Sequence, residues 1–472
     1  MTMDMIISLA KRRGFVFQSS EIYGSLNGCW DYGPLGVELL NNLKKAWWNE
    51  MTYRDNIEGI DASILMHPKT WEASGHTKQF SDPMIDNKVS KARYRADVLI
   101  EEFIAKLRAK NKIEKANLME EALEHCDKNE DFYNLIMQYE IKDPVSGTMD
   151  WTEVRNFNLM FKTFVGPVED TNAVVYLRPE SAQGIFVNFK NVMETARMKV
   201  PFGIAQIGKA FRNEINTKNF LFRTREFEQM EMQYFVKPGD EKEAFDYWKQ
   251  ERWDWWVRYG MKPESMRWKE HEKLAHYAIA AVDIEYLFPF GWGEIEGIHS
   301  RTDFDLKAHQ EASGKKMEYV DTVNGDRFVP YVVETSGGVS RGFMAYLCNA
   351  YDEEEVPTGK GDSETRSVLR FHPKLAPITV AVFPLVNKDG MPEYATEIYK
   401  DLQKTFNAKY DTSGAIGRRY RRQDEVGTPY CVTIDGETIE KHTVTIRERD
   451  SMLQERISVD KIKTWIFEKM NG

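Results

Sequence analysis

The sequence has few cysteines, and they lie far apart. Its 472 residues include Cys29, Cys126, Cys348 and Cys431, each at least 83 residues from the next. No C-x-x-C pair occurs, so neither a Cys-rich zinc module nor a disulfide framework is supported. We therefore expect a reducing, cytoplasmic compartment.

Long apolar runs are also missing. The longest nearly uncharged apolar stretch, 376–386, has 11 residues and is interrupted by Pro377 and Pro384. A membrane-spanning helix needs about 20 such residues. The N-terminus places the basic residues 11–13 after a short apolar stretch, which is the reverse of the order in a secretory signal. We expect a protein that neither spans a membrane nor is secreted.

An excess of positive charge is lacking as well. The chain has 64 Lys and Arg against 74 Asp and Glu, a net charge of −10. Such a balance argues against binding nucleic acid through the overall field, so any such contact needs a local basic patch. With 42% hydrophobic residues the chain is too apolar to be disordered, and its length predicts several domains.

The first half of the sequence alternates helical and strand-like patterns. Pro34 is placed for the first turn of an amphipathic helix over 34–54. Residues 97–140 are helical in pattern but densely charged, which favours a helical hairpin on the surface. Two strand-like stretches, 204–215 and 225–236, are separated by a polar loop. They predict an antiparallel hairpin.

The pattern after this hairpin predicts two further regions. A helix rich in tryptophan should place Trp248, Trp253, Trp255 and Trp256 in a core. Strands near 291–297 and 327–335 precede two glycines and a helix over about 339–350. From residue 378 onward come strand 378–386, helix 392–407, a polar loop, strands 430–434 and 442–446, and helix 459–470. This order indicates a separate α/β domain with a mostly parallel sheet.

The predicted hairpin has unusually charged faces. Because alternate residues of a strand share a face, Arg212 and Glu214 should lie together. On the second strand the same rule groups Arg225, Phe227, Gln229 and Glu231. Burying so many charges without a ligand would be costly. A solvated hairpin with charge pairs across its strands is the alternative, and the hairpin alone does not decide between them.

A third segment favours a ligand site. Glu334 and Ser336 share a strand face, and they precede Gly337, Gly338 and a helix with Arg341 in its first turn. Glycines let a ligand approach the backbone closely, and a helix N-terminus favours an anion. A Gly-Gly pair before a helix is weak evidence by itself, but together with the two strands it becomes specific.

Together these segments resemble the class II aminoacyl-tRNA synthetases. The run 211–214 (FRNE) through Phe227 is similar to their second signature motif, and 334–341 (ETSGGVSR) to their third. More narrowly, the chain resembles the dimeric glycyl-tRNA synthetases. Further matching segments are 30–36 (WDYGPLG), 74–82 (SGHTKQFSD), 93–97 (RYRAD), 178–184 (RPESAQG), 291–297 (GWGEIEG) and 417–429 (GRRYRRQDEVGTP).

The resemblance implies an α+β fold. It implies a class II catalytic domain over 1–370, an antiparallel β-sheet flanked by helices, with a helical insertion at about 85–155. An α/β anticodon-binding domain would follow over 371–472. A homodimer is also implied. One departure bears on it, because the first class II motif usually ends its strand in a proline and 56–63 has none.

The resemblance further implies activation of glycine by ATP with Mg²⁺ and transfer of glycine to tRNA. Because Cys-rich spacing is absent, we expect no zinc. Arg212, Glu214 and Arg341 would be catalytic: Arg212 would clamp the α-phosphate, Glu214 accept from the adenine amino group and Arg341 stack on adenine opposite Phe227. Arg223 or Arg225 would reach the outer phosphates, and Glu294 would hold Mg²⁺ or else be a surface charge. The implied ATP-binding set is Arg212, Asn213, Glu214, Phe222, Arg223, Thr224, Arg225, Glu226, Phe227, Glu294, Ile295, Gly338, Val339, Ser340 and Arg341.

For glycine, the resemblance brings three acids together. Glu180, Glu231 and Glu334 would surround the ammonium group of glycine, and Arg95 would pair with its carboxylate. Alternatively, these residues form ordinary salt bridges within the protein. The implied set is Arg95, Glu180, Phe227, Glu228, Gln229, Met230, Glu231, Glu334, Thr335, Ser336, Gly337 and Gly338. Neighbouring carboxylates repel, so at least one should have a raised pKa in the empty site. The methyl group of alanine should be excluded by overpacking.

The strongest basic patch is Arg418, Arg419, Tyr420, Arg421 and Arg422. Within an anticodon-type domain it would contact tRNA phosphates and stack a base on Tyr420; otherwise it is a solvated run. Two other functions stay open. One is a synthetase for serine, threonine, alanine or proline, and the other is a catalytically inactive class II-like binding subunit.

Overall fold

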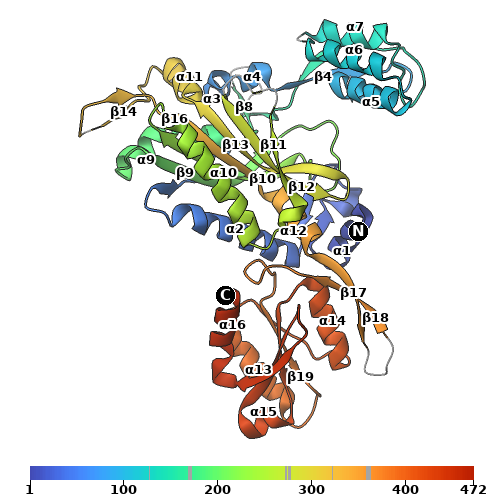
Figure 1. Cartoon of the computed structure of the whole chain (residues 1–472), viewed down its shortest axis with the longest axis vertical. Coiled ribbons are helices and arrows are strands. Elements are labelled where there is room, and N and C mark those ends of the chain that lie inside the picture. Colours follow the sequence, from blue (N-terminus) through green and yellow to red (C-terminus); the bar gives the residue numbers. More distant parts are fainter. Residues whose placement is uncertain are drawn as a thin grey trace. The chain divides into compact units, whose positions relative to one another are not determined.

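The computed structural model describes residues 1–126, 128–167, 173–271, 274, 278–321, 323–357 and 363–471. It divides the chain into two compact units (Figure 1). One unit consists of residues 1–64 and 180–472, and the other of residues 65–179. Among the residues described, no helix is both long and apolar enough to cross a membrane.

The main sheet of the first unit has seven described strands in the order β11-β12-β13-β16-β10-β9-β3. Neighbours are antiparallel except β3, which runs parallel to β9. The predicted antiparallel pairing of the hairpin strands, β9 and β10, is confirmed. The strands are β3 (Ile57–Gly59), β9 (Phe202–Phe211), β10 (Glu226–Val236), β11 (Met266–Glu270), β12 (Ala280–Phe288), β13 (Gly291–Thr302) and β16 (Tyr331–Gly338).

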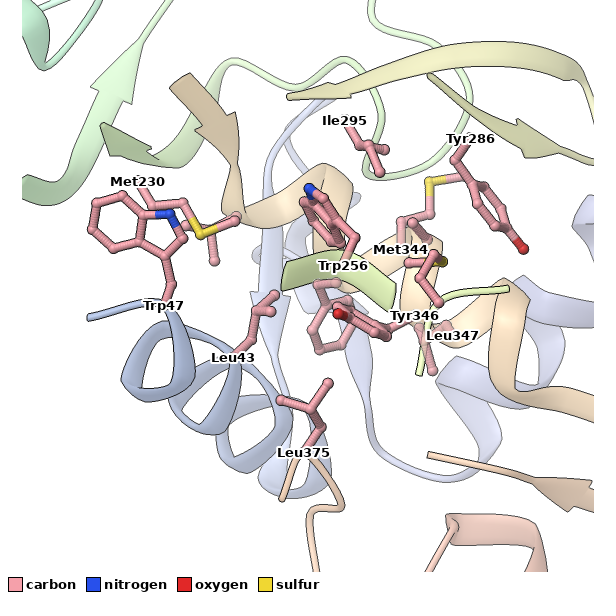
Figure 2. Packing of buried hydrophobic residues seen from close by; sticks show 14 of the residues in the cluster. Leu43, Trp47, Met230, Trp256, Tyr286, Ile295, Met344, Tyr346, Leu347 and Leu375 are labelled. Atoms are coloured by element: carbon pink, nitrogen blue, oxygen red, sulfur yellow. The ribbon is translucent and has the colours of Figure 1, made fainter. Parts of the chain in front are cut away.

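Three helices supply the core on one face of this sheet: α2 (Pro34–Thr52), α10 (Glu241–Arg258) and α12 (Val339–Ala350). Figure 2 shows Trp47 of α2, Trp256 of α10 and Met230 of β10 in this core. The predicted amphipathic helix at 34–54 and the helix at 339–350 are thus confirmed. Trp253 is an exception to the prediction for the indoles, because it is only half-buried and stacks on Trp268.

A second apolar cluster covers one end of the opposite face. Helices α8 (Ala182–Val187), α9 (Phe189–Thr195) and α11 (Phe304–Ser313) contribute to it, together with Phe202 and Phe235. The remaining elements of this half are α1 (Met3–Arg12), β1 (Val16–Gln18), a 3₁₀ turn (Glu21–Tyr23), β2 (Trp30–Tyr32), a 3₁₀ turn (Pro263–Ser265), β14 (Tyr319–Val320), β15 (Arg327–Phe328), β17 (Tyr351–Pro357) and β18 (Ser363–Leu369).

The second unit contains three helices in place of the predicted hairpin (Figure 1). Within its described residues these are α5 (Ala96–Ala109), α6 (Ile113–Glu124) and α7 (Asn129–Gln138). The hairpin prediction was wrong because each helix carries its own apolar stripe, and the stripes bury Ile100, Met119 and Ile136 in a shared core. The unit also contains α3 (Pro68–Ala73), α4 (His76–Gln79), β4 (Ser81–Asp86), β5 (Arg93–Arg95), β6 (Arg155–Asn158), β7 (Lys162–Phe164) and β8 (Val174–Tyr176).

The C-terminal region has its own sheet and apolar core. Its five described strands are ordered β20-β19-β21-β22-β23. They are β19 (Val380–Pro384), β20 (Ala408–Tyr410), β21 (Tyr430–Ile434), β22 (Thr443–Glu448) and β23 (Gln454–Ser458), with helices α13 (Met391–Leu402), α14 (Ile416–Val426), α15 (Gly436–Lys441), α16 (Ile462–Asn471) and a 3₁₀ turn (Val459–Lys461).

This sheet is mixed, so the prediction of a mostly parallel sheet was wrong. Strand β19 is parallel to β20 and β21, whereas β21–β22 and β22–β23 are antiparallel. The connections before β22 and β23 are too short for the crossover that parallel neighbours need. The predicted polar loop after 407 was also wrong, because it contains β20 and α14.

Candidate active site

A cleft with a volume of about 120 Å³ lies over the polar face of the main sheet. Strands β10, β13 and β16, the start of α12 and the segment between β9 and β10 supply its walls. The lining residues are Arg212, Glu214, Leu221, Phe222, Arg223, Thr224, Phe227, Glu228, Gln229, Glu294, Ser336, Gly338, Ser340 and Arg341. Most of the predicted ATP-binding residues are therefore brought together.

Arg212 and Glu214 reach the cleft by a different route from the one predicted. Strand β9 ends at Phe211, so strand alternation does not place them. A tight turn does so instead, since the Glu214 N–H donates to the Arg212 carbonyl at 2.6 Å. The Arg212 guanidinium lies 5.3 Å from the centroid of the Phe227 ring. The cleft thus holds a cation beside an aromatic ring, and both residues line it.

Arg341 projects from the first turn of α12 and lines the cleft together with Phe222 and Glu294. Its guanidinium lies 4.4 Å from the Phe222 ring centroid, and its Nε donates to the Phe222 carbonyl at 3.1 Å. Its Nη1 lies 3.0 Å from the Glu294 carboxylate. Burial by itself would raise the pKa of Glu294, but Arg341, His299 and Arg212 together lower it. Glu294 is therefore a charged oxygen donor in the cleft.

The two arginines proposed for the outer phosphates are placed differently. Arg223 lines the cleft, as does Thr224. Arg225 instead donates to the carbonyls of Glu214, at 3.0 Å, and Asn27. It therefore holds the segment that follows β9 in place.

Several predicted ATP-site residues do not face the cleft. Glu226 pairs with Lys209 on the neighbouring strand. Ile295 and Val339 are buried in the core on the opposite side of the sheet. Their neighbours in the sequence reach the cleft because strand alternation and the helical turn point adjacent side chains in different directions.

A row of buried polar side chains continues the same face of the sheet. Glu231 lies directly opposite Ser336, and Gln229 opposite Gly338, across β10 and β16. The hydroxyl of Ser181, just before α8, donates to Glu231. The backbone N–H of Ser181 donates to Gln229 Oε1 at 3.2 Å. Glu231 is 2% exposed, so this carboxyl group is removed from bulk water.

Glu334 occupies the next position along this row. It accepts a hydrogen bond of 2.6 Å from Gln233, the residue opposite it on β10. On its other side, Arg301 Nη1 donates at 3.0 Å and His299 Nδ1 lies at 2.8 Å. Burial alone would raise the pKa of Glu334, but these three partners lower it, with Arg301 contributing most. Glu334 is a buried, charged carboxylate.

Glu231 behaves in the opposite way. Burial raises its pKa, and the nearby carboxylates of Glu334 and Glu180 raise it further. The prediction that one of the three acids has a raised pKa is confirmed. The raised pKa favours the protonated form of Glu231, and a bound cation would favour loss of that proton.

Glu180 lies at the edge of this row and is half-buried. Gln183 donates to it at 3.0 Å and to Asp305 at 3.1 Å. Asp305 in turn accepts two hydrogen bonds from Arg301, at 2.9 and 3.1 Å. A continuous chain of hydrogen bonds thus joins Glu180 to Glu334 through Gln183, Asp305 and Arg301.

Four supporting residues were missed by the sequence argument: Ser181, Gln233, His299 and Arg301. The strand predicted at 291–297 in fact runs to Thr302. Extending the alternation by four residues would have placed His299 and Arg301 on one face, next to the acids of the neighbouring strand. That signal was present in the sequence.

Some predicted glycine-site residues face away from the row. Met230 is in the hydrophobic core, and Glu228 pairs with Lys44 of α2 at 3.2 Å. Thr335 lies between Glu334 and Ser336 on β16, so its side chain is on the opposite face of the sheet, where it is fully buried. Gly337 packs against the side chain of Met230, since a Cβ at this glycine would lie 3.1 Å from it.

Arg95 belongs to the second unit, at the end of β5. Within that unit its guanidinium pairs with Asp82 at 3.2 Å and with Asp97 at 2.6 Å. Its role toward a substrate carboxylate stays a prediction.

The basic run at 418–422 lies on α14 and is only partly exposed. Arg419 is buried and donates to the carbonyls of Gly414 and Pro384. Tyr420 packs edge-on against Phe383, and its hydroxyl lies 2.6 Å from that of Thr433.

Arg419 and Tyr420 thus serve the domain core, contrary to the prediction that they face tRNA. The helical period explains this, because one face of α14 must cover the sheet. Arg418 is exposed, whereas Arg421 pairs with Glu364 and Arg422 with Asp411.

Three family models match the chain. The tRNA synthetase class II core domain (G, H, P, S and T) matches residues 166–351, and the anticodon binding domain matches 379–469. Glycyl-tRNA synthetase insertion domain 1 matches 82–123 and 111–159.

Full-length relatives agree with these matches. A glycine–tRNA ligase of Chlorobaculum tepidum is 56% identical, over 99% of this chain and 100% of the relative. One from Treponema denticola is 54% identical, over 98% and 97%. One from Caldanaerobacter subterraneus subsp. tengcongensis is 53% identical, over 99% and 98%.

Proposed function

Because the chain belongs to the glycine–tRNA ligase family of class II aminoacyl-tRNA synthetases, we propose that it activates glycine with ATP and transfers it to tRNA. The observation that carries this proposal is the continuity of two sites on one sheet face. The cleft with Arg212 and Arg341 suits a nucleotide, and the adjoining row with Glu231 and Glu334 suits a small ammonium.

In the first step, the glycine carboxylate attacks the α-phosphorus of ATP. The bond to the bridging oxygen breaks, pyrophosphate leaves, and glycyl-adenylate forms. Negative charge builds on the non-bridging oxygens during this displacement. Arg212, which lies beside Phe227 in the cleft, would neutralise that charge with a bidentate guanidinium contact.

In the second step, a hydroxyl group of the terminal tRNA ribose attacks the glycyl carbonyl carbon. The ester forms, the hydroxyl proton is lost, and AMP departs with the electrons of the mixed-anhydride bond. The same arginine would stabilise the departing phosphate. No further residue is assigned to this step.

Adenine would bind in the part of the cleft between Phe227 and Arg341. Phe227 offers an aromatic ring that lines the cleft, and Arg341 offers a guanidinium that already lies over Phe222. Glu214 would accept a hydrogen bond from the adenine amino group, and Arg223 would contact the outer phosphates. Stacking and cation–π contacts of this kind contribute about 0.5–2 kcal/mol each.

Glu294 fits the role of a Mg²⁺ ligand. Its carboxylate is charged and 45% exposed in the cleft, and hard oxygen donors are what this ion prefers. When bound there, Mg²⁺ would supply positive charge to the outer phosphates. The chain's own contribution is to keep Glu294 ionised, which Arg341 does first among its neighbours.

The selection of glycine would depend on charge and on lack of space. Glu334 supplies a permanent negative charge, and Glu231 acquires one when the ammonium displaces its proton. Ser336 lies opposite Glu231 and would reduce the space beside the bound glycine. An additional methyl group would overpack this region, at a cost of roughly 1–3 kcal/mol.

The assembly and location follow the same family. We infer a homodimer in the cytoplasm, supported by the resemblance to the dimeric synthetases. The exposed Arg418, with Arg421 and Arg422, would contact tRNA. Light scattering of the purified protein would test the dimer, and a monomer at micromolar concentration would contradict it.

Amino-acid-dependent exchange of pyrophosphate into ATP tests the function directly. Glycine should support exchange, whereas serine, threonine, alanine and proline should not. Exchange with one of those four instead would favour the alternative synthetase. No exchange with any amino acid would favour an inactive binding subunit.

A further inference from the structure

A second cluster of potential ligands lies on the same sheet and shares only His299 with the groups described above. It consists of His271, immediately after β11, Asp283 of β12 and His299 of β13. Among the residues that the structure describes, one ligand atom from each lies within 4.8 Å of the others. The side chains are 33%, 14% and 19% exposed, so the cluster is accessible from solvent.

The strand register explains why these side chains meet. Asp283 lies opposite Gly297, and His299 follows two residues later on the same face. A Cβ at residue 297 would lie 2.8 Å from His299 Cε1 and 3.2 Å from Asp283 Oδ1. Glycine at this position therefore leaves the space in which the imidazole and the carboxylate approach each other.

The hydrogen bonds orient the donor atoms. His299 Nδ1 lies 2.8 Å from Glu334 Oε1, which leaves Nε2 directed to the cluster side. Metal-bound histidines commonly donate their second nitrogen to a carboxylate in this way. His271 Nε2 lies 2.8 Å from Asp283 Oδ2, so a bound ion would replace the proton that these two atoms share.

We propose that His271, Asp283 and His299 bind a divalent ion of the Zn²⁺ type. Two imidazole nitrogens and one carboxylate oxygen are a ligand set that Zn²⁺ prefers, with a fourth position left for water. The expectation of no zinc was based on the absence of Cys-rich spacing, and this set is assembled from two strands and the residue that follows a third. It is separate from Glu294, whose oxygens suit a harder ion.

The ion would have a positioning role toward Glu334. Metal at Nε2 fixes the His299 tautomer that carries its proton on Nδ1 and donates it to Glu334. The proposal itself does not depend on the reaction, because metal binding is measured with neither ATP nor glycine present.

The test uses the untagged full-length protein, stripped with a chelator and titrated with Co²⁺. We expect about one equivalent to bind, with the strong visible bands of a four- or five-coordinate site, and Zn²⁺ to displace it. His271→Ala and Asp283→Asn each remove a ligand without touching Glu334. Each should weaken Co²⁺ binding by roughly tenfold or more.

The matched control is His125→Ala, which removes an exposed histidine of the second unit. It should bind Co²⁺ as tightly as the wild type does. Circular dichroism checks that each variant is folded. The proposal is overturned if the wild type binds no Co²⁺, or if both ligand variants bind it with unchanged affinity.

Discussion

Gln233 donates a 2.6 Å hydrogen bond to Glu334, the residue directly opposite it on the neighbouring strand. With Arg301 and His299 on its other side, Glu334 is held as a charged carboxylate inside the sheet face. Glu231, on the same face, has no cation among its hydrogen-bond partners within the described residues, and its pKa is raised. Two chemically identical side chains therefore differ in charge.

This difference predicts unequal effects on stability when each acid is replaced by its amide. Glu334→Gln leaves Arg301 with less compensation in a buried site, so the free energy of unfolding should fall by about 3 kcal/mol. Glu231→Gln replaces a neutral acid by a neutral amide and should change it little at low pH. Urea unfolding of the two variants checks this, and equal losses at pH 5 would contradict it.

The pH dependence of stability should follow Glu231. Its pKa is higher in the folded state than in the unfolded chain, so the folded protein binds the extra proton. This contribution to stability is complete below the ordinary glutamate pKa and is lost as pH rises toward the raised value. In Glu231→Gln, the free energy of unfolding should vary less with pH between these two pKa values. A wild-type stability rising with pH across it, and unchanged by the substitution, would refute the assignment.

Glycine binding should release a proton. If the ammonium displaces the proton of Glu231, calorimetric binding enthalpies should vary with the ionisation enthalpy of the buffer. The variation should disappear in Glu231→Gln, with a higher KM for glycine and a nearly constant KM for ATP. Proton release of the same size in the variant would assign it to another group.

Arg212→Ala should slow adenylate formation strongly. Loss of one oriented donor to a developing oxyanion typically costs about 10²–10³-fold in rate. Pyrophosphate exchange measures the effect, and Arg418→Ala is the comparison because that exposed arginine does not line the cleft. Exchange by Arg212→Ala within a few-fold of wild type would remove Arg212 from the mechanism.

On α14, two adjacent arginines should have separable effects. Arg419→Gln removes buried hydrogen bonds to carbonyls and should lower the stability of the C-terminal region by about 3 kcal/mol. Arg418→Gln should leave stability unchanged and weaken tRNA charging with a reduced salt dependence. Adenylate formation should be normal in Arg418→Gln. Thermal unfolding and charging assays at two salt concentrations distinguish the two residues.

Local patterns predicted the elements that carry the site. The spacing of apolar residues located α2, and alternation placed Phe227, Gln229 and Glu231 on one face of β10. The same rule failed for Arg212 and Glu214, because a strand ends where its hydrogen bonds end and no residue marks that point. Their place depends on a turn and on Arg225, 11 residues beyond Glu214.

Contacts between distant segments were beyond local rules. The pairing of Ser181 with Glu231 joins residues 50 positions apart, and nothing near either one indicates it. For α14, the run of arginines indicated a basic surface, but the neighbouring strands decide which side of the helix is covered. Arg419 and Tyr420 are therefore buried despite their polar groups.

The alternation along β10 also limits changes in strand length. Met230 packs in the tryptophan-rich core, and Glu231 faces the polar row. A one-residue deletion between Phe227 and Met230 would exchange these two surroundings, placing a carboxyl group among indoles and a thioether in the polar row. Single substitutions at these positions change one contact, whereas an insertion or deletion inverts the whole strand. We expect libraries of variants to accept replacements in β10 far more often than changes in its length.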